Sequence, residues 1–186
     1  MFAGLYPDEV GMLLADATPV DLLQRLPEQA AALTNAGQRA RTFQRLASFG
    51  IVRLLIGSAL GELDRFPAGA RDEIAAFESV PGHWKAYADE VDALPESMSQ
   101  VGQLGGLGTL PLIVLSATEG SGSPEEARIK RETHAEMAAI SSDSRQIVVE
   151  GATHTGLAVN PDHASTTSAA IRQLVDAVRM GRLLST

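Results

Sequence analysis

The sequence predicts an α/β fold of about three parallel strands with helices and one large helical insertion. Short apolar runs that end in polar residues occur at residues 10–16, 110–117 and 145–150, as expected of strands. The last two runs are each followed by a segment with helix start signals. Strands that alternate with helices in this way pair in parallel, so the pattern indicates an α/β protein.

Length and composition indicate one globular domain. The chain has 186 residues, of which 45% are hydrophobic and 20% are charged, which is typical of a folded protein. A net charge of −8, with Lys and Arg scattered singly or in pairs, argues against a nucleic-acid partner. The absence of cysteine excludes disulfides, thiolate metal sites and a cysteine nucleophile. The four histidines are isolated from one another, so no metal site is expected.

The sequence shows no pattern of a targeting or membrane segment. No apolar run approaches the roughly 20 residues that a membrane helix needs. The opening sequence MFAGLYPDEV lacks the basic region and the apolar region of a signal peptide. We therefore expect a cytoplasmic protein without a membrane partner.

The first strand is predicted over residues 10–16. The sequence VGMLLA is a brief apolar run that ends at Asp16, and we interpret it as a buried strand. A break at Thr18-Pro19 follows, and Asp21 is placed to cap a helix over Leu22–Leu33.

A long helical insertion separates the first strand from the second. Apolar residues at three- and four-residue spacing predict several short helices between residues 20 and 108, separated by prolines that include Pro95. Ordinary connections have about 4–6 residues. An insertion of this length is interpreted as a lid.

Two strand–helix pairs complete the predicted fold. Leu110–Ala117 is the clearest strand, because a continuous apolar run is expected of a parallel strand that is covered on both faces. The motif Ser-Pro-Glu-Glu at residues 123–126 has the pattern of a capping box and starts a helix that extends to about Ile140. Arg145–Glu150 is the third strand, and an amphipathic helix begins at Asn160-Pro161.

One histidine stands where α/β proteins often carry function. The third strand runs into Gly-Ala-Thr-His, which places His154 on a loop at the carboxyl end of that strand. Loops at this edge of a parallel sheet present functional groups, and an imidazole exchanges a proton near neutral pH. His154 is therefore a candidate catalytic base, with an ordinary exposed loop histidine as the alternative. The other histidines are assigned no role, and His134 is expected on the exposed face of its helix.

This order of elements resembles the C-terminal half of an α/β-hydrolase, and the resemblance covers most of the chain. LYPDEV with GMLLADATPVDLL is similar to the sixth strand and the entry to the lid, and LPLIVLSA is similar to the seventh strand. RQIVVEGATHTGL with NPDHA is similar to the eighth strand, the catalytic-histidine loop and the closing helix. The resemblance implies that His154 is the general base of a nucleophile–acid–histidine triad. It also implies hydrolysis of an ester, amide or similar bond, without a cofactor.

The resemblance leaves two candidates for the acid that orients His154. Most members of the family carry it just after the seventh strand, where Glu119 is the nearby carboxylate, and others carry it after the sixth strand, where Asp16 stands. Asp16 is slightly favoured, because Glu119 lies in a loop rich in Gly and Ser. A turn residue at the end of the strand is the alternative reading of Asp16.

The resemblance also implies that the lid sets the choice of substrate. Phe43, Phe49 and Trp84 are bulky apolar residues of the insertion and are candidates to line a substrate pocket. The alternative is that they pack the helices of the lid, as aromatic residues at helical spacing more often do.

The nucleophile of the family is not found in the sequence. It sits on a Gly-x-Ser-x-Gly elbow, whose spacing is absent around Ser58 and Ser121. Met1–Tyr6 is similar to the end of the helix that follows the elbow. We therefore expect an N-terminally truncated hydrolase, active on a small-molecule substrate only when complete. The alternatives are a split hydrolase completed by a partner chain and a non-catalytic binding protein, and both predict that a partner or homodimer mate covers the exposed edge of the first strand.

Overall fold

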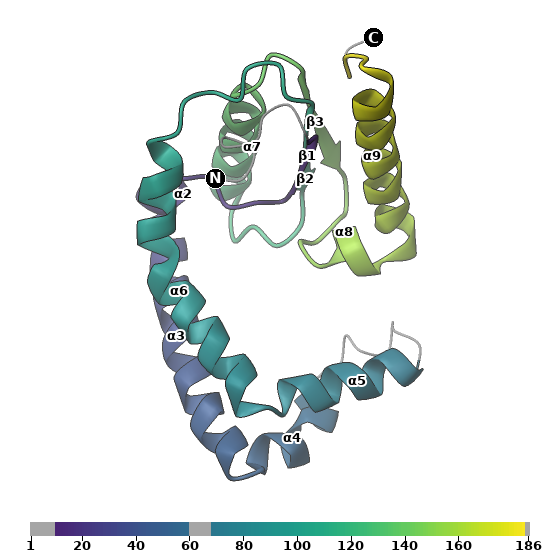
Figure 1. The fold of residues 1–186 in the computed structure, drawn as a ribbon. Helices are drawn as coiled ribbons and strands as arrows, with labels where there is room; N and C mark the ends of the chain where they lie inside the picture. The colour runs from purple at the N-terminus through teal and green to yellow at the C-terminus, as the bar shows by residue number, and fades with distance from the viewer. Residues whose placement is uncertain (1–9, 60–67, 185–186) are drawn as a thin grey trace. The chain divides into compact units, whose positions relative to one another are not determined.

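The computed structural model describes residues 10–59 and 68–184, which form two compact units. Residues 10–25 and 99–184 make up the first unit, and the described residues between 26 and 98 make up the second. The first unit contains a sheet with helices (Figure 1), and the described residues of the second are helical. The predicted α/β class is therefore confirmed.

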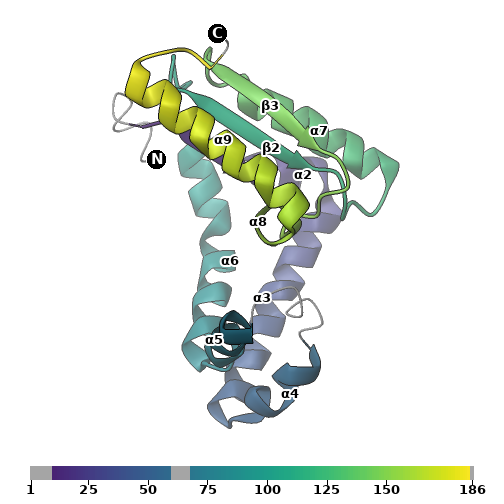
Figure 2. The ribbon, with the colours of Figure 1, turned by 90° about the vertical axis from the view of Figure 1, so that its right-hand side faces the viewer.

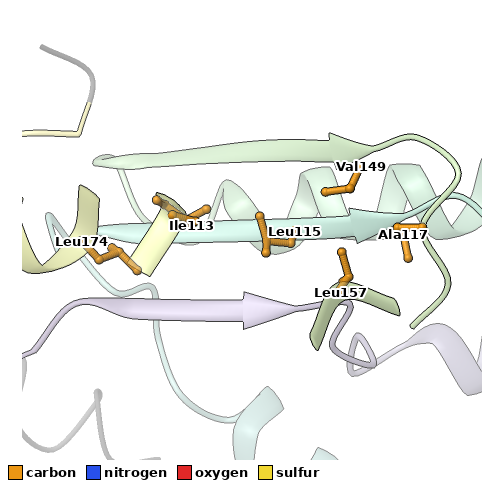
Figure 3. Close-up of a cluster of buried hydrophobic side chains, with 8 residues drawn as sticks. Ile113, Leu115, Ala117, Val149, Leu157 and Leu174 are labelled. Carbon is orange, nitrogen blue, oxygen red and sulfur yellow. The ribbon is translucent and has the colours of Figure 1, made fainter. Parts of the chain in front are cut away.

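The sheet of the first unit has three parallel strands, β1 (Met12–Ala15), β2 (Leu112–Ala117) and β3 (Ser144–Val149), in the order β1-β2-β3. In the register of the sheet, Met12 lies opposite Leu112, and Leu112 lies opposite Ser144. The predicted parallel pairing is confirmed, with each strand found within two residues of its expected bounds. All three strands point the same way, so their carboxyl ends form a single edge (Figure 3).

One long helix covers each face of this sheet. Helix α7 (Pro124–Ala138) lies on one face and helix α9 (Pro161–Met180) on the other (Figures 1 and 2). All six residues of β2 are buried, because its side chains alternate between the two faces. The core under α7 contains Leu112 and Val114. The core under α9 (Figure 3) consists of Ile113, Leu115, Ala117, Val149, Ala152, Leu157, Ala170 and Leu174.

Local sequence signals start both covering helices. The Ser123 hydroxyl oxygen accepts from the Glu126 N–H at 3.1 Å, and Asn160 Oδ1 accepts from the Asp162 N–H at 3.1 Å. The Glu126 carboxylate turns back as a capping box predicts, but it accepts from the Gly122 N–H, at 2.6 Å. These bonds satisfy backbone donors that a helix leaves unpaired at its start.

Helices of the insertion are longer than the sequence predicts. Helices α3 and α6 each have 22 residues and lie between β1 and β2 in the chain. No helix in the described part of the chain is both long and apolar enough to cross a membrane. The helices of this region are α2 (Leu22–Arg25), α3 (Pro27–Ser48), α4 (Ile51–Ala59), α5 (Ala68–Glu78) and α6 (Pro81–Gly102).

Two prolines account for the differences from the predicted helices. The expected helix Leu22–Leu33 is interrupted at Leu26, which has φ −128° and ψ 78°, because a residue before proline avoids the helical region. Pro95 was expected to separate two helices, but it lies inside α6. Pro95 is exposed, and the long helix continues through it although it cannot donate the usual backbone hydrogen bond.

Within the described residues, β1 is paired on one side only. The N–H groups of Met12 and Asp16 donate to the carbonyls of Pro111 and Leu115, both at 2.8 Å. The N–H groups of Leu13 and Ala15 therefore point away from β2. The predicted edge is thus present in the described residues, and its cover by a partner stays a prediction. The segment Met1–Tyr6, expected to end a helix, lies outside the described residues.

Candidate functional site

Two of the predicted site residues meet at the carboxyl edge of the sheet. Asp16 directly follows β1, and His154 lies in the loop after β3. Although they are 138 positions apart in the chain, the His154 Nδ1 atom lies 3.1 Å from the Asp16 Oδ2 atom. Parallel strands bring them together, because both residues follow strands that end at the same edge.

Asp16 adopts a backbone conformation that turns its carboxylate back over the sheet. Its φ is 49°, in the left-handed region that Asp and Asn tolerate better than most residues. The carboxylate Oδ1 accepts from the Ala117 N–H at the end of β2, at 3.0 Å. The turn after β1 thus places the carboxylate across the ends of two neighbouring strands.

Lys130 forms an ion pair with the same carboxylate. It projects from α7, and its Nζ atom lies 2.9 Å from each of the two Asp16 oxygens. The Lys130 side chain is 17% exposed and the Asp16 side chain 4% exposed, so solvent screens the pair only weakly. Lys130 was not predicted as a site residue, because it is one of many scattered basic residues and no local pattern singles it out.

This environment keeps Asp16 ionised. Burial alone raises the pKa of the Asp16 carboxyl, but the hydrogen bonds from Lys130 and from the Ala117 N–H, together with the Lys130 charge, outweigh it. The net effect lowers the pKa of Asp16 below its ordinary value of 3.8. Near neutral pH, His154 therefore faces a carboxylate, which accepts a hydrogen bond and cannot donate one.

His154 is accessible from solvent, and hydrogen bonds hold its loop both before and after it in the chain. Its side chain is 69% exposed, and among the described residues its ring has one hydrogen bond, the one with Asp16. Before it, the Gly151 N–H donates to the Thr118 hydroxyl at 2.8 Å, with Gly151 at φ 73°. After it, the short helix α8 (Gly156–Val159) begins, and the Gly156 N–H donates to Thr153 Oγ1 at 3.0 Å.

We expect Gly156→Ala to destabilise the His154 loop. A Cβ atom at this position would lie 2.8 Å from Thr153 Oγ1 and 3.5 Å from His163 Nδ1, so the loop must shift to relieve the overlap. Overpacking of this kind costs about 1–3 kcal/mol, measurable as a lower free energy of unfolding in urea. Gly82→Ala is the control, because its nearest neighbour, Val80, is 3.8 Å away. An equal loss of stability in both variants would contradict this account of the loop.

Glu119, the other candidate acid, is not brought to His154. Its backbone N–H donates to the Ala152 carbonyl at 2.9 Å, which joins the two loops. Its side chain is exposed, and no bond between its carboxylate and His154 occurs in the described residues. Geometry therefore favours Asp16 as the acid of any His154 pair.

The aromatic residues proposed to line a substrate pocket lie in the second unit. Phe43 and Trp84 stack on each other with ring centroids 4.7 Å apart, and the Trp84 Nε1–H donates to the Glu78 carbonyl at 2.7 Å. Phe49 is 82% exposed at the end of α3. The stacking favours helix packing as the role of Phe43 and Trp84. A substrate role for the three residues stays a prediction.

His134 is the residue that sequence reasoning placed wrongly. It was expected on an exposed helix face, but it is 1% exposed and faces the sheet from α7. Burial lowers the pKa of His134, because the charged imidazolium loses its hydration. The buried face of α7 could not be predicted from the sequence. Its positions carry Lys130, Thr133 and His134, where a buried helix face usually has apolar residues.

Neither a metal-binding cluster of the described residues nor the surface hollow of the first unit lies at this edge. No group of three or more His, Asp or Glu side chains that could hold a metal ion occurs among them. A surface hollow of about 410 Å³ lined by Pro111, Asp143 and Arg182 lies at the amino ends of β2 and β3. It is therefore at the opposite edge of the sheet from His154.

Comparisons of the chain with protein-family models, with curated proteins and with solved structures found no match.

Proposed function

We propose that this chain supplies the acid–base part of a hydrolytic site, with His154 as general base and Asp16 as the carboxylate that orients it. The observation that supports this role is the 3.1 Å contact between His154 Nδ1 and Asp16 Oδ2 at the carboxyl edge of a parallel sheet. This edge is where open α/β sheets bind and transform ligands. The arrangement agrees with the C-terminal half of those α/β-hydrolases in which the acid follows the sixth strand, whereas most members carry it after the seventh.

The contact defines which ring nitrogen performs the chemistry. An ionised Asp16 accepts from Nδ1–H, so the neutral ring leaves Nε2 as the proton acceptor. In hydrolysis of an ester or amide, Nε2 takes the proton of the attacking hydroxyl and later gives it to the leaving group. The carboxylate stabilises the imidazolium formed between these two steps. Exposure of the His154 side chain leaves Nε2 accessible to a reacting group.

The nucleophile in this proposal comes from polypeptide other than the described residues. No hydroxyl group within residues 10–59 and 68–184 forms a hydrogen bond with His154, and the sequence has no Gly-x-Ser-x-Gly elbow. Truncation alone predicts an inactive chain, but the exposed His154 beside Asp16 leads us to expect slow hydrolysis of activated esters by base-assisted attack of water. A complete site would use a covalent intermediate.

The Lys130 ion pair supports a second candidate, a binding protein without catalysis. Lys130 binds the same carboxylate, at 2.9 Å, that His154 contacts at 3.1 Å. In this reading, Asp16 and Lys130 form a structural ion pair and His154 is an incidental neighbour. The two candidates differ in whether His154 accelerates a reaction.

The deciding experiment is p-nitrophenyl acetate hydrolysis by the purified chain and by His154→Ala. We expect His154→Ala to lower the protein-dependent rate by about 100-fold, the lower end of what a positioned general base contributes. His83→Ala is the matched control, because His83 Nε2 also lies 3.1 Å from a carboxylate, that of Glu78, and both residues belong to the second unit. That variant is expected to keep the full rate.

Two outcomes would contradict the proposal. Equal rates in the wild type and His154→Ala would assign the slow reaction to other groups and favour the binding protein. An initial burst of p-nitrophenolate in proportion to the protein would reveal a nucleophile within the chain. That burst would contradict the part of the proposal that places the nucleophile elsewhere.

A further inference from the structure

A buried chain of hydrogen bonds lies behind the Asp16–His154 pair. His134 on α7 and Ser116 on β2 are each 1% exposed, and His134 Nδ1 lies 2.8 Å from the Ser116 hydroxyl oxygen. Gln146 on β3 donates from Nε2 to the same hydroxyl at 2.8 Å. On its other side, His134 Nε2 lies 3.1 Å from the carbonyl oxygen of Ala17. These bonds link β3, β2 and α7 in series and end at Ala17, the residue after Asp16.

The partners of His134 determine the position of its proton. The Ala17 carbonyl only accepts, so Nε2 must carry the proton and donate. Burial lowers the pKa of His134 and favours the neutral ring, so Nδ1 is bare and accepts from the Ser116 hydroxyl. Gln146 fits this direction, because its amide nitrogen donates to the Ser116 oxygen and leaves the hydroxyl hydrogen free to donate to His134.

The Ala17 carbonyl is the point at which this chain reaches the candidate site. Asp16 has a left-handed backbone, which is unfavourable for a side chain with a Cβ atom and persists only when neighbouring bonds hold it. On one side, the Asp16 N–H is held by the Leu115 carbonyl at 2.8 Å. On the other side, the bond from His134 holds the carbonyl of Ala17, in the peptide between Ala17 and Thr18. The strained turn is therefore fixed at both ends.

We infer that His134 is a positioning residue, which holds the turn after β1 through the Ala17 carbonyl so that the Asp16 carboxylate reaches His154. This inference deepens the proposed function, on which it rests, by adding a residue that touches neither partner of the pair. Charged groups near the ring are Asp16 and Lys130, which oppose each other electrostatically. The neutral His134 ring adds no charge of its own to the site. Its effect on His154 is geometric.

The test compares two amide substitutions that differ in reach. In His134→Gln, the longer side chain still places a donor near Ala17 and an acceptor near Ser116. In His134→Asn, the shorter side chain retains the acceptor for Ser116 but cannot span to Ala17. Thr133→Val controls for damage to α7, because the Thr133 hydroxyl is buried and, among the described residues, bonds only carbonyls of its own helix, at 3.0 Å.

The measured quantity is the tautomer of His154, read from the ¹⁵N shifts of its ring nitrogens above neutral pH. We expect the wild type, His134→Gln and Thr133→Val to carry the proton on Nδ1, where Asp16 accepts it. His134→Asn is expected to shift the proton largely to Nε2, the tautomer that an unconstrained histidine side chain prefers. A merely structural role would lower the free energy of unfolding without changing this tautomer.

The possible results distinguish failure of the positioning role of His134 from failure of the proposed catalytic role of His154. An Nδ1 proton retained in a folded His134→Asn would overturn the inference, whatever the esterase activity. If His134→Asn does not fold, failure of His134→Gln to keep the Nδ1 proton would overturn it instead. If His134→Asn changes the tautomer of His154 but the wild type shows no His154-dependent ester hydrolysis, the positioning role of His134 is upheld and the catalytic role of His154 is rejected.

Discussion

Asp16→Asn is expected to lower the free energy of unfolding by about 3 kcal/mol near neutral pH. Asn keeps the tolerance for a left-handed backbone and an acceptor for the Ala117 N–H, so the substitution removes mainly the charge. Lys130, with a side chain only 17% exposed, is then left without its ion-pair partner. Removal of one member of a buried pair costs about 3–5 kcal/mol, and the partial exposure of Lys130 places this case at the low end.

The loss should depend on pH in a definite direction. The folded protein lowers the pKa of Asp16 below its ordinary value of 3.8. Its carboxylate therefore contributes stability that is fully present above pH 3.8 and is lost as the pH falls through the lower, folded-state pKa. Urea unfolding near neutral pH should show the full difference between wild type and Asp16→Asn, and unfolding in stronger acid should show a smaller one.

An exposed ion pair provides the control for Asp16→Asn. Lys85 Nζ lies 2.5 Å from Asp89, but both side chains are about 60% exposed, and such pairs contribute little. Lys85→Met should therefore change stability much less than Asp16→Asn does. A loss in Asp16→Asn that is the same at all pH values would show that the effect does not come from the charge of Asp16.

Leu115→Ala is expected to lower the free energy of unfolding by about 4 kcal/mol, the largest effect that we predict. Leu115 is fully buried at the centre of β2 and packs in the core under α9 (Figure 3). Truncation removes its apolar contacts and leaves a cavity that the sheet, paired on both sides of β2, cannot close. Buried Leu→Ala substitutions cost about 2–5 kcal/mol, and rigid surroundings give the higher values.

The measurement is urea unfolding followed by far-UV circular dichroism, with Leu54→Ala as the matched control. Leu54 is 84% exposed on α4, so the same chemical change creates no cavity there. We expect Leu54→Ala to change stability by less than about 0.5 kcal/mol. A similar small loss in Leu115→Ala would contradict the sheet core described here.

Local sequence patterns were sufficient for the three strands and the two covering helices of the first unit. The continuous apolar run of β2 is buried on both faces, and Ser123 and Asn160 cap the helices that they were predicted to start. These predictions succeed because burial on both faces and a helix cap leave short-range signatures. The helices of the insertion were predicted less well, because the effect of a proline depends on its position. Pro27 is the first residue of α3 and keeps Leu26 out of the helical conformation, whereas Pro95 lies inside α6, which continues through it.

The partners within the candidate site were decided by tertiary structure. Sequence placed His154 on a loop after a strand but left Asp16 and Glu119 open as its acid, because local patterns do not report which distant side chains meet. Lys130 binds Asp16 although the two residues are 114 positions apart in the chain, and no local sequence pattern predicts this contact. The register of three parallel strands and the face that α7 turns to them brought these groups together.

What the sequence by itself determined is the α/β class and the position of His154 at the carboxyl edge of a parallel sheet, because both follow from the alternation of short apolar and amphipathic segments. Only the tertiary structure decided that Asp16 meets His154, that Lys130 shares its carboxylate, and that His134 is buried behind it. The physical reason is that polar contacts between residues far apart in the chain depend on packing geometry, which leaves no periodic trace in either segment.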